Sequence, residues 1–328
     1  MTAAWLGAIL SVGAMGFAIQ RGATCTVAAV DEVLTRGRAH RLLAMLEASL
    51  WVAGGLALAR LAHLSGSMPG GYAVSAWTVL GGALLGLGAW VNRACVFGAV
   101  ARFGSGEWAY AATPLGFFAG CLSVMPLYDR PAAGMPSGAS PLFQVSAPFA
   151  VVFGVFALWR LWPGLRALRE ADGSGGLHKT LWKPHNATIV IGVSFVLTLL
   201  LAGRWAYTDV LADLADAMRA GSVSLVLPAL LLVALFVGAL IGGRMTGRRQ
   251  PAALSAAQVV RCFAGGVVMA WGSQLIPGSN DGLILIGIPL LYPHAWLAFL
   301  SMFGAIAAAM RVQRWFLARH AAGEARSA

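Results

Sequence analysis

The sequence predicts an all-α, polytopic transmembrane helical bundle that forms a single domain over residues 1–328. Hydrophobic residues make up 59% of the chain and charged residues only 11%, whereas a soluble domain has about 25% charged residues. The mean hydropathy is +0.76. The chain also has 41 glycines, a residue that allows membrane helices to approach each other closely. A soluble core cannot absorb this much apolar surface.

About nine apolar runs, bounded by charged residues, proline or glycine, predict the spans. Each run is close to the roughly 20 residues that cross a bilayer as a helix. The first run has no basic residue ahead of it, unlike a signal peptide, so we expect it to remain as the first span. We expect the spans at residues 3–20, 42–63, 73–91, 107–126, 146–166, 187–203, 224–243, 256–275 and 294–316.

Basic residues alternate between the connections in a way that predicts orientation, because cytoplasmic loops are enriched in Lys and Arg. This alternation places the N-terminus outside the cytoplasmic (inner) membrane and the C-terminus inside the cell, and the basic clusters can also contact anionic membrane lipids. The basic side holds Arg21, Arg36, Arg38, Arg41, Arg93, Arg102, Arg160, Arg166, Arg169, Lys179, Lys183, Arg244, Arg248, Arg249, Arg311, Arg314, Arg319 and Arg326. The opposite side holds Arg130, Arg204, Arg219, Asp129, Asp209, Asp213, Asp216 and Asp281.

Three connections, 21–41, 92–106 and 276–293, contain a glycine or Pro-Gly break followed by an apolar stretch too short to cross. Such stretches are typical of re-entrant half-helices, and irregular backbone at membrane depth requires surrounding protein or a wet cavity. We therefore expect a permeation path there, with ordinary loops as the alternative. The short stretches are Thr24–Leu34, Cys95–Phe103 and Ser279–Leu290.

Residues 81–98 and 265–282 align without a gap, which matches four glycines and places Cys95 on Ser279. The two copies belong to the third and eighth spans, which cross in opposite directions, as in the inverted repeats of transporters. We expect repeat 1 over about 1–126, linking spans over about 146–203 and repeat 2 over about 224–316. The alternative is a chance match between two glycine-rich spans.

The residues at the three breaks have the chemistry of an anion path. A half-helix start offers unpaired backbone N–H groups and the positive end of the helix dipole, and adjoining glycines leave room for a ligand. A buried cysteine is often only a small apolar side chain, and we assign Cys121 and Cys262 to the core. The predicted path residues are Cys25, Cys95 and Ser279, supported by Gln20, Arg21, Thr24, Asn92, Gly98, Gln274, Gly278, Asn280 and Gly282.

Several classes of function are disfavoured. The net charge of +11 lies in short clusters between spans and forms no basic domain for nucleic acid. The four cysteines and the histidines lack metal-ligand spacing, and no cofactor motif is present, so we expect neither metal nor cofactor. We expect Arg261 to extend to the cytoplasmic interface. No span shows the buried acidic residue that marks a proton relay.

The segments GFAIQRGATC (Gly16–Cys25), GLGAWVNRACVFG (Gly86–Gly98) and GGVVMAWGSQLIPGSNDG (Gly265–Gly282) resemble the YeeE/YedE sulfur-transport family. The resemblance implies thiosulfate import through an hourglass-shaped interior, where three cysteines relay thiosulfate by S–H to sulfur hydrogen bonds. Cys95 matches the central cysteine and Cys25 the cytoplasmic one. A small cytoplasmic sulfur carrier of the TusA-like kind is an implied partner.

This sequence departs from the family pattern at Pro277-Gly278-Ser279-Asn280, where the family has cysteine in place of serine. A hydroxyl is harder than a thiol and prefers oxygen, so the outer step is expected to differ. The leading hypothesis is a permease, and not an enzyme, for thiosulfate or a related small sulfur-containing anion. The alternatives are a selenium-related transporter of the same family, a membrane thiol redox enzyme or sensor, and a membrane scaffold.

Overall fold

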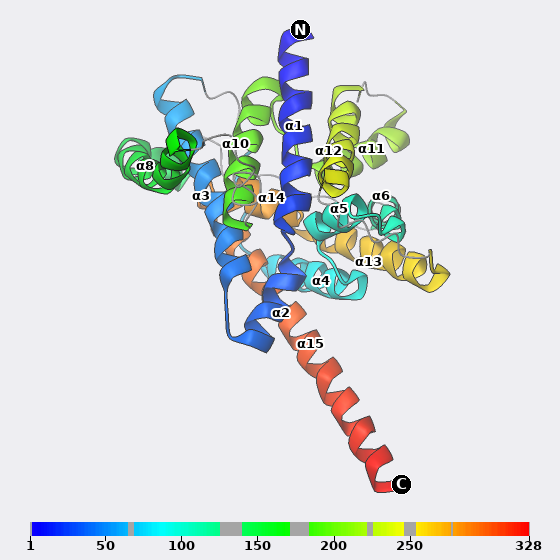
Figure 1. The fold of residues 1–328 in the computed structure, drawn as a ribbon. Helices are drawn as coiled ribbons and strands as arrows, with labels where there is room; N and C mark the ends of the chain where they lie inside the picture. The colour runs from blue at the N-terminus through cyan, green and yellow to red at the C-terminus, as the bar shows by residue number, and fades with distance from the viewer. Residues whose placement is uncertain are drawn as a thin grey trace.

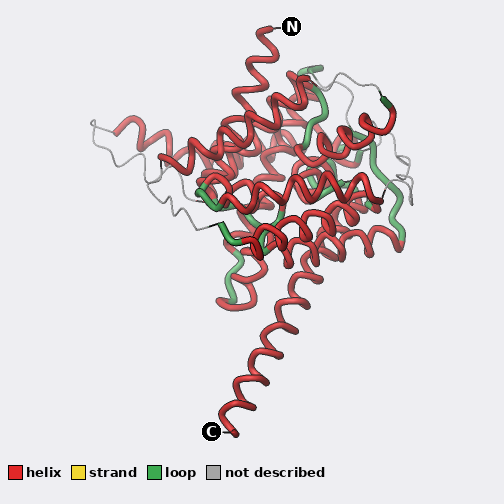
Figure 2. Tube along the Cα trace, turned by 90° about the vertical axis from the view of Figure 1, so that its right-hand side faces the viewer, coloured by secondary structure: helices red, strands yellow, loops and turns green. Residues whose placement is uncertain are grey.

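The structure, a computed structural model, describes residues 2–64, 69–124, 140–170, 184–221, 226–245, 254–276 and 278–327. It is 85% helical, and the described residues contain no strand. The two termini lie at opposite ends of the molecule (Figure 1), and the last helix projects from the body (Figure 2). Among the residues named above, Asp129, Arg130, Lys179, Lys183, Arg248, Arg249 and Pro277 lie outside the described ranges.

A helix occupies each of the nine predicted spans. Among the described residues, seven helices are long and apolar enough to cross a membrane, or eight if α13 and its bent continuation count as one span, and Trp108–Val124 is shorter. The all-α polytopic fold is thereby confirmed, and the count of nine spans remains a prediction. The helices are α1 (Thr2–Gly22), α3 (His40–Leu61), α4 (Ala76–Asn92), η1 (Trp108–Ala111) with α6 (Ala112–Val124), α8 (Ser146–Glu170), α10 (Pro184–Ala202), α12 (Val226–Met245), α13 (Ala256–Leu275) and α15 (Pro293–Ser327).

Helices α4 and α13 pack against each other in antiparallel directions through glycines. A β-carbon added at Gly81 would lie 2.7 Å from the carbonyl oxygen of Gly272. One added at Gly88 would lie 2.8 Å from the carbonyl oxygen of Gly265. No side chain fits at such distances, so these glycines allow the two backbones to touch. In the same way, α4 packs on α15 and α13 packs on α6.

A second glycine crossing joins α1 to α12, where a β-carbon at Gly16 would lie 1.9 Å from the carbonyl oxygen of Leu235. Helix α8 packs at the periphery, mainly against α3 and α7 (Pro141–Gln144). Its Leu158 and Trp159 are about two thirds exposed (67% and 70%), as expected of a helix that faces lipid.

Short helices follow the three predicted breaks. Helix α2 (Thr26–Arg36) follows α1, and α5 (Val96–Gly104) follows α4. After α13 comes α14 (Asn280–Gly282), a single turn in the middle of the bundle (Figure 1), which continues as the π-helical segment Leu283–Gly287. A further helix, α11 (Tyr207–Ala220), lies between α10 and α12 and was not predicted from the sequence.

Candidate functional site

The three short helices begin directly after Cys25, Cys95 and Ser279. Each of these residues occupies the N-cap position, and none of the three uses its side chain to cap its helix. The exposed fractions are 7% for Cys25, 0% for Cys95 and 1% for Ser279. The side chains are therefore inside the protein and free of a capping role.

Cys95 lies where the starts of α2 and α5 meet. The backbone N–H of Thr26, the first residue of α2, donates a hydrogen bond to Cys95 Sγ at 3.2 Å. The thiol of Cys25 lies beside that of Cys95. Gly98 makes this proximity possible, because a β-carbon there would lie 2.5 Å from Cys25 Sγ. The two cysteines thus form a thiol pair from positions 70 residues apart.

Thr26 also connects the thiol pair to the third break. Its Oγ1 donates a hydrogen bond to Asn280 Oδ1 at 3.2 Å. Asn280 is 0% exposed, and its Nδ2 has no hydrogen-bond partner among the described residues. A buried donor without a partner costs free energy unless a ligand or water occupies the place. The centre of the protein therefore holds one unused N–H donor next to a row of polar groups.

Ser279 contacts a buried carboxylate. Its Oγ donates a hydrogen bond to Asp281 Oδ1, and Thr208 Oγ1 donates to the same oxygen. The backbone N–H of Thr208 donates to Asp281 Oδ2 at 3.3 Å. Asp281 is 2% exposed and lies in the connection between two predicted spans, so the expectation that no span holds a buried acidic residue is not contradicted, but the connection itself holds one. The compact turn of α14 folds this side chain back into the protein.

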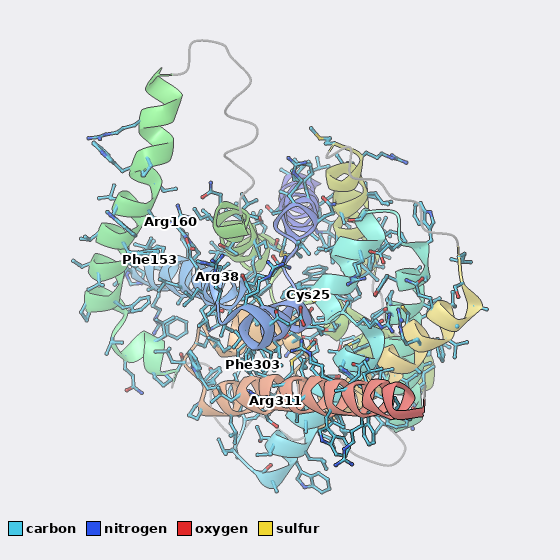
Figure 3. The ribbon with its side chains drawn as sticks, turned by 60° about the horizontal axis from the view of Figure 1, so that its bottom comes forward. Cys25, Arg38, Phe153, Arg160, Phe303 and Arg311 are labelled. Carbon is cyan, nitrogen blue, oxygen red and sulfur yellow. The ribbon has the colours of Figure 1, made fainter. Side chains whose placement is uncertain are left out.

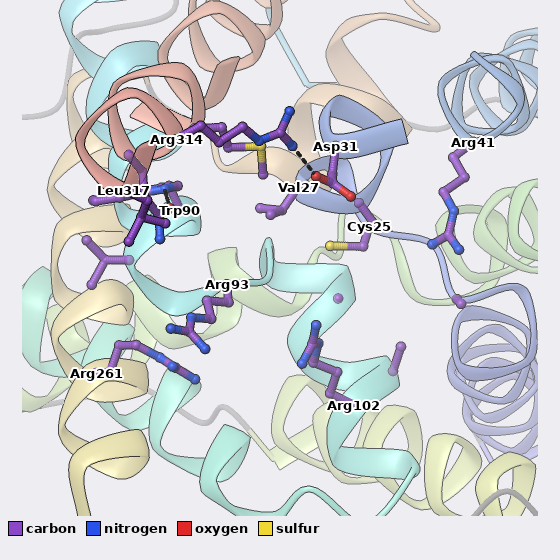
Figure 4. Close-up of a pocket in the computed structure, with 17 residues that line it drawn as sticks. Cys25, Val27, Asp31, Arg41, Trp90, Arg93, Arg102, Arg261, Arg314 and Leu317 are labelled. Carbon is purple, nitrogen blue, oxygen red and sulfur yellow. Dashed lines mark hydrogen bonds and ion pairs between the residues drawn. The ribbon is translucent and has the colours of Figure 1, made fainter. Parts of the chain in front are cut away.

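A large basic cavity of about 810 Å³ lies against Cys25. Viewed from the C-terminal end of α15, Cys25 lies near the centre of the molecule, whereas Phe153 and Arg160 lie at its edge on α8 (Figure 3). Arg93, Arg102 and Arg261 point into the space that Cys25 Sγ faces (Figure 4). The charged residues that line this basic cavity are Arg41, Arg93, Arg102, Arg261, Arg314 and Asp31.

Ion pairs neutralise only part of this positive charge. Arg314 pairs with Asp31 at 2.7 Å, and Arg102 pairs with Glu107 at 3.2 Å. Arg93 and Arg261 have no acidic partner among the described residues. Arg261 therefore lines a cavity where it was expected only to reach an interface. A cavity with surplus guanidinium groups attracts anions.

A small cavity of about 60 Å³ lies against Ser279. Its wall includes Gln274 and Gly278, together with Arg204, Asp209 and Asp213. Helix α13 carries Arg261 of the basic cavity and Gln274 of the small cavity, and their separation of 13 positions spans about 20 Å of helix. The two cavities therefore lie toward opposite ends of α13, and the three breaks lie between them.

Two of the predicted supporting residues have structural contacts near the path. Asn92 Nδ2 donates to the carbonyl oxygen of Ala94 at 2.8 Å, and Asn92 Oδ1 accepts from Thr113 Oγ1 at 3.0 Å. Gln274 Nε2 donates to Cys121 Sγ at 3.2 Å. Asn92 therefore holds the break between α4 and α5 in place, and Gln274 ties the small cavity to α6.

Other predicted supporting residues lie away from the thiol pair. Gln20 Nε2 donates to Ser105 Oγ at 3.2 Å, in the contact of α1 with α5. Arg21 lies over the ring of Phe17 at 5.9 Å, and neither Arg21 nor Thr24 lines the basic cavity. A β-carbon at Gly282 would meet nothing within 4 Å, so no close contact requires glycine there.

Several residues at the site were not predicted from the sequence. Thr26 follows the cysteine motif directly, and its hydroxyl beside Cys25 was a usable signal. Thr208 gave no signal, because it is 71 residues from Ser279 and reaches it only through the packing of α11. Asp281 was visible in the repeat motif, two residues after Ser279.

Comparison with known proteins supplies the family. A search of curated proteins found no match for this chain. The family model described as sulphur transport matches residues 21–308, a region that contains all three breaks, the small cavity and most of the lining of the basic cavity. Together with the all-α polytopic fold, this match shows that the chain belongs to the YeeE/YedE family of membrane sulfur transporters.

Proposed function

We propose that the protein is a permease that carries thiosulfate, or a related small sulfur-containing anion, between the small cavity and the basic cavity. The observation that carries this proposal is the meeting of the three helix starts at the buried Cys95, between the two cavities. The anion passes Ser279, the unpaired Nδ2 of Asn280, and then the thiol pair. Backbone N–H groups at the starts of α2 and α5 favour negative charge there.

Thiols suit a substrate with a terminal sulfur atom. A thiol is a soft, weak hydrogen-bond donor that remains uncharged while it contacts an anion. Cys25 and Cys95 can therefore hold the substrate by S–H to sulfur hydrogen bonds without a covalent step. The guanidinium groups of Arg93 and Arg261 then attract the anion into the basic cavity.

The antiparallel contact of α4 and α13 supports an inverted repeat. Gly81 aligns with Gly265 and Gly88 with Gly272, and the observed contacts join Gly81 to Gly272 and Gly88 to Gly265. Such reciprocal contacts are those of a two-fold axis between two copies of one unit. An inverted repeat with a central site is the architecture of alternating-access transporters.

The basic cavity faces the cytoplasm in this proposal, because most basic residues of the connections are expected on the same side of the membrane as this cavity. This orientation has the N-terminus outside the inner membrane and the C-terminus in the cytoplasm. A TusA-like carrier would receive the sulfur-containing anion at the mouth of the basic cavity.

Uptake of labelled thiosulfate into proteoliposomes tests the proposal. Cys95→Ala removes the thiol at the centre, and Cys262→Ala is the matched control, since Cys262 is equally buried and lines neither cavity. We expect uptake in wild type and Cys262→Ala and at least a tenfold loss in Cys95→Ala. Thiosulfate, sulfite and selenium-containing anions are compared as substrates. Equal uptake in Cys95→Ala would contradict the proposed path.

The thiol pair also favours a second candidate function, a membrane thiol sensor. The sequence offered no second cysteine near Cys95, whereas the structure places Cys25 beside it. An oxidant such as diamide would take two electrons and two protons from the pair and form a disulfide. A sensor would show this reaction and no uptake of any sulfur-containing anion, which separates it from the permease.

A further inference from the structure

Asp281 is the one Asp, Glu, Lys or Arg that is buried among the described residues, with 2% of its surface exposed. A charged carboxylate inside a membrane protein is costly, and such residues often mark ion or proton pathways. No ion pair joins Asp281 to any described basic residue. Its location two residues after Ser279 places it directly on the proposed path.

The hydrogen bonds of Asp281 occupy the hydroxyl that the anion would meet. Ser279 Oγ and Thr208 Oγ1 both donate to Asp281 Oδ1. While Asp281 is charged, Ser279 therefore points its proton at the carboxylate and its lone pairs elsewhere, and the carboxylate repels an approaching anion. Protonation of Asp281 removes the repulsion and releases the Ser279 hydroxyl to donate to the anion.

Of the titratable groups near Asp281, Tyr207 and Cys95 have other hydrogen-bond partners, and the two other carboxylates lie in the wall of the small cavity. Tyr207 on α11 donates its hydroxyl to the carbonyl oxygen of Val96 at 3.2 Å. Cys95 on α5 is engaged with Thr26 and Cys25. The remaining titratable or charged groups, in the wall of the small cavity, are Tyr72, Arg204, Asp209 and Asp213.

We propose that Asp281 carries a proton that accompanies each anion past Ser279. The proposal rests on the proposed function. A proton from the water of the small cavity binds a carboxylate oxygen, the anion passes, and the proton leaves toward the basic cavity after the anion. No bond of the anion breaks.

The experiment uses the full-length protein in proteoliposomes with labelled thiosulfate outside and a trapped pH-sensitive dye inside. Potassium and valinomycin hold the membrane potential at zero, because an anion that carries one proton can still be charged. We expect inward thiosulfate flux to acidify the lumen. An acidic outside should increase accumulation by about tenfold per pH unit for each coupled proton, since one pH unit corresponds to a tenfold proton ratio.

Asp281→Asn keeps the size of the side chain in a permanently neutral form, so thiosulfate should enter down its own gradient without acidification and without response to the pH gradient. The matched control is Asp216→Asn, an exposed position on α11 that lines neither cavity, and it should retain the wild-type response.

Thiosulfate flux in the wild type without lumen acidification overturns this inference alone, as does accumulation driven by a sodium gradient. This wild-type measurement decides the matter even if Asp281→Asn does not fold. Absence of any thiosulfate flux in the wild type overturns the proposed function, and this inference with it.

Discussion

The two ends of the proposed path differ in size, charge and softness. The basic cavity has about 810 Å³, five arginines and the thiol of Cys25. The small cavity has about 60 Å³, two aspartates, one arginine and the hydroxyl of Ser279. An anion is therefore stabilised at the first end and opposed by negative charge at the second. On the proposed path, the small cavity therefore selects the anion and the basic cavity attracts it.

The same difference appears at aligned positions of the two repeat copies. Cys95 aligns with Ser279, and Gly98 aligns with Gly282. A β-carbon at Gly98 would lie 2.5 Å from Cys25 Sγ, whereas one at Gly282 would meet nothing within 4 Å. One copy is therefore closed tightly around a thiol pair at this glycine. The other copy has free space at its glycine, although its hydroxyl and carboxylate are buried.

Reversal of charge in the basic cavity should have the largest effect on thiosulfate uptake among the changes that test this difference between the two ends. Arg93→Glu combined with Arg261→Glu removes two of the three cavity arginines that have no ion pair among the described residues and adds two negative charges. Each unit charge a few ångströms from the anion contributes about 1 kcal/mol at high effective dielectric, so a change of four unit charges amounts to about 4 kcal/mol and uptake of thiosulfate should fall about 1,000-fold.

The control for charge reversal is Arg311→Glu combined with Arg319→Glu, which changes the net charge equally at exposed positions of α15 that do not line the cavity. Labelled uptake in proteoliposomes measures both. A similar fall in both double variants would mean that net charge, and not the cavity, determines the rate.

Crowding of the thiol pair should have the next largest effect. Gly98→Ala places a β-carbon 2.5 Å from Cys25 Sγ and 3.1 Å from Ala94 Cβ. Overpacking of this kind costs about 1–3 kcal/mol, so we expect about a tenfold loss of uptake and a lower thermal midpoint. Gly282→Ala, at the aligned position, should lose much less.

Gly304→Ala, in open space on α15, is the control for expression and folding. Uptake and thermal unfolding are measured for all three variants. Equal losses at Gly98 and Gly282 would show that the two copies do not differ in packing at these positions.

A feature of this site could be predicted when it depends on neighbouring residues in the sequence, and could not when it depends on contacts between distant segments. The helix breaks at Cys25, Cys95 and Ser279 are local properties of glycine, proline and short apolar runs, and the sequence predicted them. Asp281 followed a Pro-Gly turn between two spans, which is also the pattern of an outer loop. Only the fold of α14 against α11 decides that its carboxylate is buried.

Contacts between distant segments were beyond the sequence alone. The thiol pair depends on the close approach of α2 and α5 at Gly98, and the contact of Thr208 with Ser279 depends on α11. Arg261 shows the same limit, since one residue near the end of a span can either reach lipid headgroups or line a cavity. The neighbouring helices, and not the residue type, determine which.

Exchange of the thiol and hydroxyl side chains at Cys95 and Ser279 should change the selectivity between thiosulfate and sulfite by a smaller factor. Ser279→Cys places a soft thiol at the small cavity and weakens the hydrogen bond to Asp281. We expect the ratio of thiosulfate to sulfite uptake to rise several-fold, about the range of one hydrogen bond of 0.5–1.5 kcal/mol. Cys95→Ser should shift this ratio in the opposite direction. Unchanged ratios in both variants would indicate that these two side chains do not contact the sulfur atom of the substrate.

The smallest expected effect is on the labelling of Cys25, and it tests the electrostatic contrast directly. Cys25 is 7% exposed and faces the arginines, while Cys95 is 0% exposed. A negatively charged methanethiosulfonate reagent should therefore modify Cys25 several-fold faster than a positively charged one, with Cys25→Ser used to assign the modified site by mass spectrometry. Ser279→Cys, beside Asp209 and Asp213, should show the reverse preference. Both preferences should shrink with added salt, because the screening length falls to about 3 Å at 1 M. A preference at Cys25 that does not respond to salt would mean that reagent shape, and not the arginines, controls access.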